Sequence, residues 1–553
     1  MRTPTECQRR VLWTPLIMAA GLVIVGTINN STLARDGVAP VSTSQAATAI
    51  PAPQLDPGGG DTGGVTDVPV SDTKVGLTLN DVADRVGKNK ISINIVWTLI
   101  TGFLVMFMQA GFALVETGMC RAKNAAHTMS MNFMIYPLGM LGFYVCGFAF
   151  MFGGLGGNPN LGAGTSALNQ MCSFTIAGKT INVIGWKGFC LGPSVYDCGI
   201  FALFLFQMVF MDTTATIPTG TMAERWKFSA FVLYGLCVGT IMYPVYGCWV
   251  WGGGWLAQLG TSFGLGHGTV DFAGSSVVHM QGGVIALVGG WLLGPRLGKY
   301  NKNGSANPLP PHSVPMVILG TFILAFGWFG FNAGSSLAGT DDRIAIVATN
   351  TMLASATGAF ATYLWMVGPR KMLPDPSMLC NGMLAGLVAI TAPCAFVTSI
   401  SACIIGIVAG VLVVESVFFV DRVLKIDDCV GAISVHGVNG AWGVIALGLF
   451  ADGTYGAGWN GVGPDQYLGR AGQGVTGLLY GDVKQLVAEL IGVVACFVYL
   501  AIISTIVFKI TDAICGNRVP PEVEWQGLDM PEMGVAGYSG FVMDRAAETP
   551  HSH

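Results

Sequence analysis

Two histidines lie within runs of apolar residues that are long enough to cross a lipid bilayer. His279 lies in DFAGSSVVHMQGGVIALVGGWLLG, and His436 lies in DCVGAISVHGVNGAWGVIALGLF. Ionisable side chains are rare in membrane spans, where they usually line a path for a solute or a proton. A neutral imidazole has one hydrogen-bond donor and one acceptor, so the two rings can bind a small polar molecule or relay a proton. The alternative is that each ring is only a satisfied residue of the core.

In both runs an aspartate stands eight residues before the histidine, Asp271 before His279 and Asp428 before His436. Helical residues rise 1.5 Å each, so this spacing moves a ring about 12 Å along the helix axis. If the two runs enter from opposite faces, both rings arrive near the middle of a hydrocarbon core about 30 Å thick. Aspartate is also a common N-cap of helices, and capping can be the only role of either residue.

The composition is that of a membrane protein with many spans. Of the 553 residues 52% are hydrophobic and only 10% are charged, whereas soluble domains carry about 25% charged residues. The net charge of −4 gives no indication of nucleic acid binding. No nucleophile–base set and no Cys/His spacing of a metal site is present in the sequence. We therefore expect neither an enzyme nor a cofactor.

The apolar runs predict an all-α membrane protein with eleven transmembrane helices in a domain over residues 91–516. The runs lie near 93–118, 127–153, 197–218, 228–251, 272–294, 314–337, 344–367, 380–398, 400–420, 430–451 and 485–510. The shared Asp-to-His spacing is followed by GVIAL at 283–287 and again at 443–447. This repetition predicts two inverted five-helix repeats with the site between them, plus one extra helix.

The two ends of the chain set the predicted orientation. Residues 1–36 have the charged, apolar and small-residue regions of a signal peptide, with an uncleaved N-terminal helix as the alternative. Residues 37–90 are predicted to form a flexible external linker. Lys and Arg are more frequent in the loops that then face the cytoplasm. The N-terminus is therefore expected outside the cell inner (plasma) membrane, with a cytoplasmic tail at 517–553.

Three cysteines and one aspartate each allow more than one assignment. Cys172, Cys190 and Cys198 lie in or beside a long loop predicted to be external, where a disulfide can form, but the pairing cannot be deduced. Asp212 lies within the third span, where it can pair with polar neighbours or belong to a proton route.

Several motifs resemble those of the ammonium transporter (Amt/Mep/Rh) family over roughly residues 91–540. DFAGSSVVH and ISVHGVNG resemble its signature segments. The other matches follow in order along the chain: NAAHTM at 124–129, FQMVF at 206–210, MAERWKFSA at 222–230, WGGGWL at 251–256, GWFGFNAGSS at 327–336 and EWQGLD at 524–529. The resemblance implies eleven helices with two inverted halves, assembled as a homotrimer with one pore per subunit.

The resemblance also assigns roles to single residues. It implies that His279 and His436 are the twin histidines of the conduction path, and that Asp271 is the buried aspartate near the outer vestibule. By the same resemblance Phe210 and Phe331 form a gate, Trp251 and Ser335 recruit NH4+ together with Phe210, and Gln207 and Trp328 support the site. From the sequence alone Trp251 can instead be an interfacial tryptophan, and both phenylalanines can be packing.

The tail departs from the family pattern. GLDMPEMGVAGY stands where family members commonly have a GLD, HGE and Tyr run, so Met533 replaces the histidine and Val535 replaces the glutamate. This departure weakens the expectation that a cytoplasmic PII signalling protein binds the tail.

We expect an ammonium transporter that recruits NH4+, deprotonates it and conducts NH3, with or without the proton, across the lipid bilayer. One alternative is an ammonium sensor with the same site and little flux, although only about forty residues follow the last span, too few for a kinase domain. Another alternative is a channel for a different small neutral solute.

Overall fold

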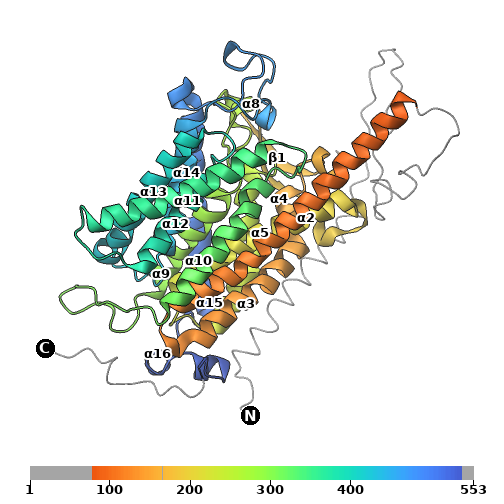
Figure 1. The fold of residues 1–553 in the computed structure, drawn as a ribbon. Helices are drawn as coiled ribbons and strands as arrows, with labels where there is room; N and C mark the ends of the chain where they lie inside the picture. Colours follow the sequence, from red (N-terminus) through yellow and green to blue (C-terminus); the bar gives the residue numbers. More distant parts are fainter. Residues whose placement is uncertain (1–77, 165, 539–553) are drawn as a thin grey trace, which may run out of the picture.

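Long apolar helices run side by side in one slanted bundle (Figure 1). The structure is a computed structural model that describes residues 78–164 and 166–538. One end of the bundle carries a β-hairpin and α8 (Leu259–Phe263), and we call it the hairpin face. The opposite end carries α16 (Pro521–Gln526), and we call it the tail face.

The bundle is built from helices that are joined by loops of different lengths or by π-helical turns. The helices are α2 (Leu79–Met119), α3 (Ala125–Gly142), α4 (Phe148–Phe152), α5 (Cys198–Met222), α6 (Phe228–Cys237), α7 (Tyr243–Val250), α9 (Gln281–Leu293), α10 (Val314–Trp328), α11 (Arg343–Val367), α12 (Pro376–Ile390), α13 (Ser399–Phe419), α14 (Asn439–Phe450) and α15 (Val483–Cys515). Among the described residues, ten helical segments are long and apolar enough to cross a membrane. Helix α12 is apolar but shorter, because it ends at Ile390 within the predicted span 380–398.

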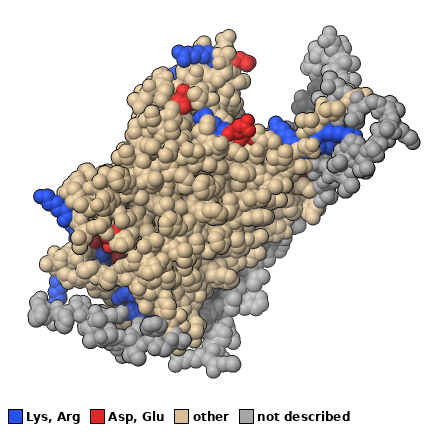
Figure 2. All heavy atoms as spheres, viewed as in Figure 1, with Lys and Arg blue, Asp and Glu red and all other residues tan. Residues whose placement is uncertain are grey.

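The surface of the bundle fits a multi-pass membrane protein. On the side seen in Figure 2, charged side chains gather toward the ends of the bundle, and a broad area between them is uncharged. Large apolar side chains such as Phe133, Phe322 and Val494 are exposed on the helices of the bundle. Soluble monomers rarely expose apolar surface on this scale. The coarse prediction of a largely helical membrane protein is therefore confirmed.

Helix α2 begins earlier than the sequence analysis expected. It starts at Leu79, so the part of the predicted flexible linker at 79–90 is helical. This stretch contains no proline, and Lys88 pairs with Asp84 one turn away at 3.4 Å, a contact that supports a helix. The predicted signal peptide and the rest of the linker, residues 1–77, lie outside the described residues.

The long loop between α4 and α5 contains a β-hairpin that an all-α prediction did not include. Strands β1 (Met171–Ile176) and β2 (Lys179–Gly185) pair antiparallel across a turn at Ala177 and Gly178. Both turn residues have positive φ, of 49° and 75°, which matches the twist of a tight hairpin. Cys172 and Cys190 are free thiols, so no pairing among the three loop cysteines is formed.

The segments that carry the two histidines cross at glycines. A Cβ atom added to Gly283 would lie 2.1 Å from the backbone nitrogen of Gly437, which is far inside van der Waals contact. Only glycine permits this approach of the two backbones. The close crossing brings the turn before α9 against the turn before α14.

The described part of the C-terminal tail packs onto the tail face. The carboxylate of Asp529 accepts hydrogen bonds from the backbone N–H groups of His127 and Gly537, at 2.9 and 3.0 Å. Glu532 accepts one from the N–H of Phe228 at 3.0 Å. The tail therefore contacts the starts of α3 and α6, although Met533 stands where the family commonly has a histidine.

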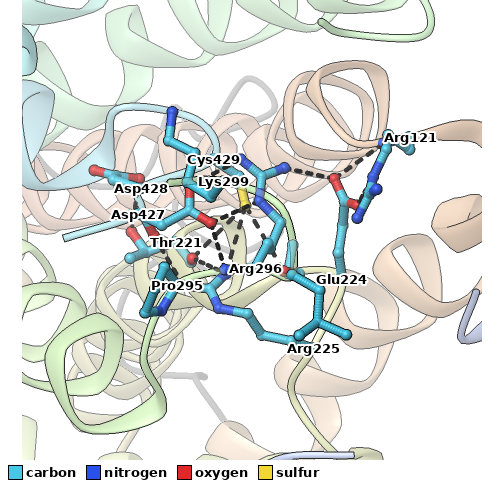
Figure 3. A network of polar contacts seen from close by, with 12 residues as sticks. Arg121, Thr221, Glu224, Arg225, Pro295, Arg296, Lys299, Asp427, Asp428 and Cys429 are labelled. Carbon is cyan, nitrogen blue, oxygen red and sulfur yellow. Dashed lines mark hydrogen bonds and ion pairs between the residues drawn. The ribbon is translucent and has the colours of Figure 1, made fainter. Parts of the chain in front are cut away.

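A network of buried ion pairs joins the loops of the tail face (Figure 3). Arg296 binds Glu224 at 2.7 Å and binds Asp427 through two nitrogens at 2.8 and 2.9 Å, while Arg121 also pairs with Glu224. Burial alone would raise the pKa of Glu224 and Asp427. The guanidinium groups outweigh burial and hold both pKa values below the ordinary carboxylate range.

Candidate functional site

The two histidine side chains meet inside the bundle. His279 lies on the π-helical turn Ser275–Met280 before α9, and His436 lies on the corresponding turn Ile433–Val438 before α14. Their Nδ1 atoms are 3.1 Å apart, and their ring centroids are 5.2 Å apart with the planes inclined by 22°. The spacing argument from the sequence predicted this meeting, and π-helical turns are frequent at functional sites.

The contact between the two rings fixes their protonation pattern. A hydrogen bond between two Nδ1 atoms needs a proton on one of them and a lone pair on the other. Two neutral rings must therefore be opposite tautomers, so one Nε2 is an acceptor and the other is a donor. The Nε2 of buried His279 has no hydrogen-bond partner among the described residues. A buried polar atom without a protein partner can form a hydrogen bond with a ligand or a water molecule.

Asp271 caps the turn that carries His279. Its Oδ1 accepts the N–H groups of Gly274 and Ser275 at 2.7 and 2.9 Å, and its Oδ2 accepts those of Ser276 and Val277 at 2.7 and 3.0 Å. The Ser276 hydroxyl adds a further bond at 2.7 Å. The carboxylate is buried, so these donors are what stabilises its charge.

Asp428 makes the corresponding contacts before His436. Its oxygens accept the N–H groups of Gly431 at 3.0 Å and Ile433 at 2.8 Å, together with the Thr221 hydroxyl at 2.9 Å. Both aspartates therefore act as caps, as the simpler sequence interpretation expected. A carboxylate that caps a turn can also act electrostatically on a nearby cation.

A column of stacked aromatic rings leads from the hairpin face to the histidines. The ring of Trp251 meets Phe210 edge-on at 6.1 Å, and Phe210 stacks on Phe331 with centroids 4.1 Å apart and planes inclined by 25°. Phe331 lies 5.3 Å from the ring of His279. Of the six residues that the sequence assigned to entry, gate and histidine pair, five lie in this column or in the histidine pair at its end, and the sixth, Ser335, hydrogen-bonds to the backbone of Phe331.

Hydrogen bonds to the backbone hold Trp251 and Ser335 in place. The indole N–H of Trp251 donates to the carbonyl of Asp271 at 2.6 Å, and the hydroxyl of Ser335 donates to the carbonyl of Phe331 at 2.8 Å. Trp251 and Ser335 are half-buried, whereas Phe210 and Phe331 are fully buried. The structure therefore places two half-buried residues at one end of the column, next to a fully buried ring pair.

Trp328 and Gln207 lie beside this column. Trp328 stacks on His279 with centroids 5.1 Å apart, and its indole N–H donates to the Thr391 hydroxyl at 3.0 Å. Gln207 is buried, and its Oε1 has no partner among the described residues. Sequence reasoning did not find Thr391, because a threonine in an apolar helix carries no signal of its own.

A small cavity lies against His436 on the side of the tail face. It has a volume of about 20 Å³, and its polar lining groups are His436, Glu116 and Asn381. The ring of Phe112 lies 6.0 Å from that of His436. Glu116 was missed in the sequence analysis, although an acidic residue near the end of an apolar run was the signal that could have found it.

Asp212 lies apart from the column. It is buried on α5, two residues after Phe210, so the helical turn directs it to a different side of the helix. Its Oδ1 has no partner within the described residues. Across the same residues no group of His, Cys, Asp and Glu side chains has the arrangement of a metal site.

Comparison with known proteins finds one family. The model of the Ammonium Transporter Family matches residues 96–538. Ammonium transporter Amt2 of Archaeoglobus fulgidus is 44% identical over 455 residues, which cover 82% of this chain and 90% of that protein. The ammonium transporter of Bacillus subtilis is 33% identical over 450 residues, or 80% of this chain and 98% of that protein.

Solved structures with the same fold include a sensor Amt protein and Mep2. A sensor Amt protein superposes with a TM-score of 0.67 at 33% identity, covering 80% of this chain and 98% of that chain. Mep2 of Candida albicans superposes with a TM-score of 0.63 at 26% identity, covering 78% of this chain and 87% of that chain.

Proposed function

Because this chain belongs to the ammonium transporter family, we propose that it moves ammonium across a membrane along the column from Trp251 to His436. The observation that carries this proposal is the continuous contact of the rings, with an accessible entry at one end and a hydrogen-bonded histidine pair at the other. No charged side chain belongs to the column itself, so a neutral molecule passes along it most easily.

Entry takes place at the hairpin face, where NH4+ meets the ring of Trp251 and the hydroxyl of Ser335. A cation over an aromatic face gains about 0.5–2 kcal/mol, depending on how far it is desolvated. Phe210 forms the floor of this site because its ring contacts both Trp251 and Phe331. The carboxylate of Asp271, whose backbone carbonyl accepts the Trp251 indole N–H, is buried and attracts the cation electrostatically.

Deprotonation allows selection of ammonium over metal ions. A charged group in the centre of a bilayer costs at least about 2.5–3.5 kcal/mol even on lenient scales. NH3 avoids this cost, whereas K+ has no proton to lose. The opposite tautomers of His279 and His436 offer NH3 both a donor and an acceptor. They can also pass on the released proton.

The finer architecture belongs to the same proposal. Asp271 caps its turn from the side of the hairpin face, and Asp428 caps the equivalent turn from the side of the tail face. This relation supports two inverted five-helix halves, with α12 counted as an eleventh, short span and α15 as the extra helix. We propose that the hairpin face is external and the tail cytoplasmic, after removal of a signal peptide.

The assembly is proposed to be a homotrimer in a cell inner membrane, and a PII protein is a proposed partner of the tail. Both come from the family alone. Mass measurement of the purified protein in detergent tests the trimer, and co-purification with PII tests the partner.

The deciding experiment measures ammonium flux and current with purified protein in liposomes. Ammonium-dependent flux that is absent for K+ supports transport, and the ratio of charge to ammonium distinguishes NH3 from NH4+ or NH3 with a proton. The similarity to a sensor Amt protein favours a second candidate, an ammonium sensor. Saturable ammonium binding without flux would indicate the sensor.

A further inference from the structure

The cavity on the tail side of the histidine pair has the size of one small molecule. Its volume of about 20 Å³ exceeds the roughly 10–15 Å³ that a single water molecule needs. Ammonium is close to water in size. Apolar side chains from several helices form most of the wall, and Glu116, Asn381 and His436 also line the space. A polar minority in an apolar wall is the usual composition of a small-molecule site.

The carboxylate of Glu116 is held in a fixed position by a hydrogen-bond network. Its Oε2 accepts bonds from the Asn132 amide and the Thr219 hydroxyl, both at 2.7 Å. The Asn132 oxygen accepts the Thr216 hydroxyl at 2.9 Å, and the Thr216 oxygen accepts the Gln109 amide at 2.9 Å. These donors come from α2, α3 and α5, so Glu116 is positioned by three helices at once.

Within residues 78–164 and 166–538, no cationic side chain compensates this carboxylate. Glu116 is 2% exposed, and among the described residues no Lys or Arg forms an ion pair with it. The other charged group that acts on it is Asp428, which is also acidic. A buried carboxylate is costly unless a cation or a proton accompanies it. Glu224 on the tail face, in contrast, has two arginine partners.

We propose that Glu116, Asn381 and His436 form a second ammonium-binding site between the histidine pair and the tail face, an inference that rests on the proposed transport of ammonium. The carboxylate supplies a negative counter-charge for NH4+ on this side of the histidine pair, and its fixed oxygens accept N–H donors. The Phe112 ring adds an aromatic surface near His436. Ammonium that enters from the tail face binds here before it reaches the histidines.

The test compares Glu116→Gln with the wild type in liposomes that expose either the hairpin face or the tail face to ammonium. Removing one charged hydrogen-bond partner should raise the half-saturation concentration from the tail face by about tenfold or more. The half-saturation concentration from the hairpin face should change by less than about twofold, which is smaller than the effect of losing one hydrogen bond. The matched control is Asp212→Asn, which removes another buried carboxylate that does not line the cavity.

Flux and binding measurements together distinguish failure of the second site from failure of the proposed transport. Unchanged half-saturation from the tail face in Glu116→Gln overturns the second site, and so does an equal rise from both faces. If the wild type shows no flux, transport fails, and ammonium bound per chain is then measured by equilibrium dialysis. Glu116→Gln should bind one ammonium ion fewer than Asp212→Asn, and equal binding would overturn the site.

Discussion

The Nδ1 atoms of His279 and His436 share one hydrogen bond at 3.1 Å, at the crossing of the two segments that carry them. The bond requires opposite tautomers when both rings are neutral. A proton that moves between the two Nδ1 atoms, with matching changes at the two Nε2 atoms, exchanges the donor and acceptor ends of the pair. The pair can therefore serve a neutral solute and relay a proton without a lasting buried charge.

We predict that His279→Ala combined with His436→Ala loses ammonium flux or selectivity while the protein still assembles. Positioned acid–base groups contribute about 100-fold or more to proton transfer, so a flux loss of this order is expected. His127→Ala is the control, because His127 is also buried but packs against Phe228 away from the column. Unchanged flux and selectivity in the double variant would show that the two rings only pack.

The entry residues should affect affinity more than rate. Trp251→Leu with Ser335→Ala removes the aromatic face and the hydroxyl at the hairpin face. We expect the half-saturation concentration to rise by about tenfold, in line with a cation–π contact of about 0.5–2 kcal/mol. Maximal flux should change little, because the phenylalanine pair and the histidines stay intact.

The control for the entry variant is Trp249→Leu. Trp249 lies two residues away and donates its indole N–H to the Val183 carbonyl at 2.9 Å, outside the column. Initial flux from the hairpin face, measured at a series of ammonium concentrations, gives the half-saturation concentration and the maximal flux. A fall in maximal flux with unaltered half-saturation would contradict an entry role for Trp251 and Ser335.

Spacing along the chain predicted that the two histidines meet, and similarity to a family predicted the aromatic column. The meeting was predictable because Asp271 and Asp428 start equivalent turns, and a helical rise is constant. The stacking of Phe210 on Phe331 was not predictable from periodicity, since both residues also fit ordinary packing. Only the family motifs favoured a gate.

The features that the sequence analysis missed depend on contacts between distant segments. Glu116 is recognised only through its hydrogen bonds with Asn132 and Thr219 on other helices. Thr391 is recognised only through its hydrogen bond with the indole of Trp328. The helical start at Leu79 was missed because its polar residues resemble a linker in composition. None of these contacts leaves a periodic signal in the chain.

The ion-pair network of the tail face should make stability depend on pH. Glu224 and Asp427 have pKa values below the ordinary range in the folded protein because Arg296 lies against both. Their stabilising contribution is complete above the ordinary carboxylate pKa and is lost as the pH falls through the lowered values. Stability should therefore be constant near neutrality and should decrease only in acid.

Arg296→Met should remove the stabilisation that the ion pairs of Arg296 provide. It leaves two buried carboxylates with reduced compensation, which costs about 3–5 kcal/mol, and it should move acid unfolding to a higher pH. The control is Lys299→Met, whose ion pair with Asp421 at 3.0 Å is more exposed and should contribute at most about 1 kcal/mol. Thermal unfolding in detergent as a function of pH checks both. Identical profiles for the two variants would refute the role of the network.

The last prediction separates the charge of Asp271 from its capping contacts. Asp271→Asn keeps one acceptor oxygen, so it loses part of the bonds to Gly274, Ser275, Ser276 and Val277. Asn nevertheless caps helices about as well as Asp, and the bond from the Trp251 indole to the Asp271 carbonyl does not involve the side chain. We therefore expect this variant to fold and to retain its entry geometry.

Asp428→Asn is the matched variant, because Asp428 also uses both oxygens to cap the turn before a histidine. The structural cost of the two substitutions should be similar. If the negative charge of Asp271 stabilises the entering cation, Asp271→Asn should reduce flux from the hairpin face by about tenfold, the equivalent of one charged hydrogen bond. Asp428→Asn should be milder, since substrate from that face reaches Asp428 after deprotonation. Flux measured from the hairpin face, at matched protein content, decides the point: equal and near-normal flux in both variants would reduce both aspartates to caps.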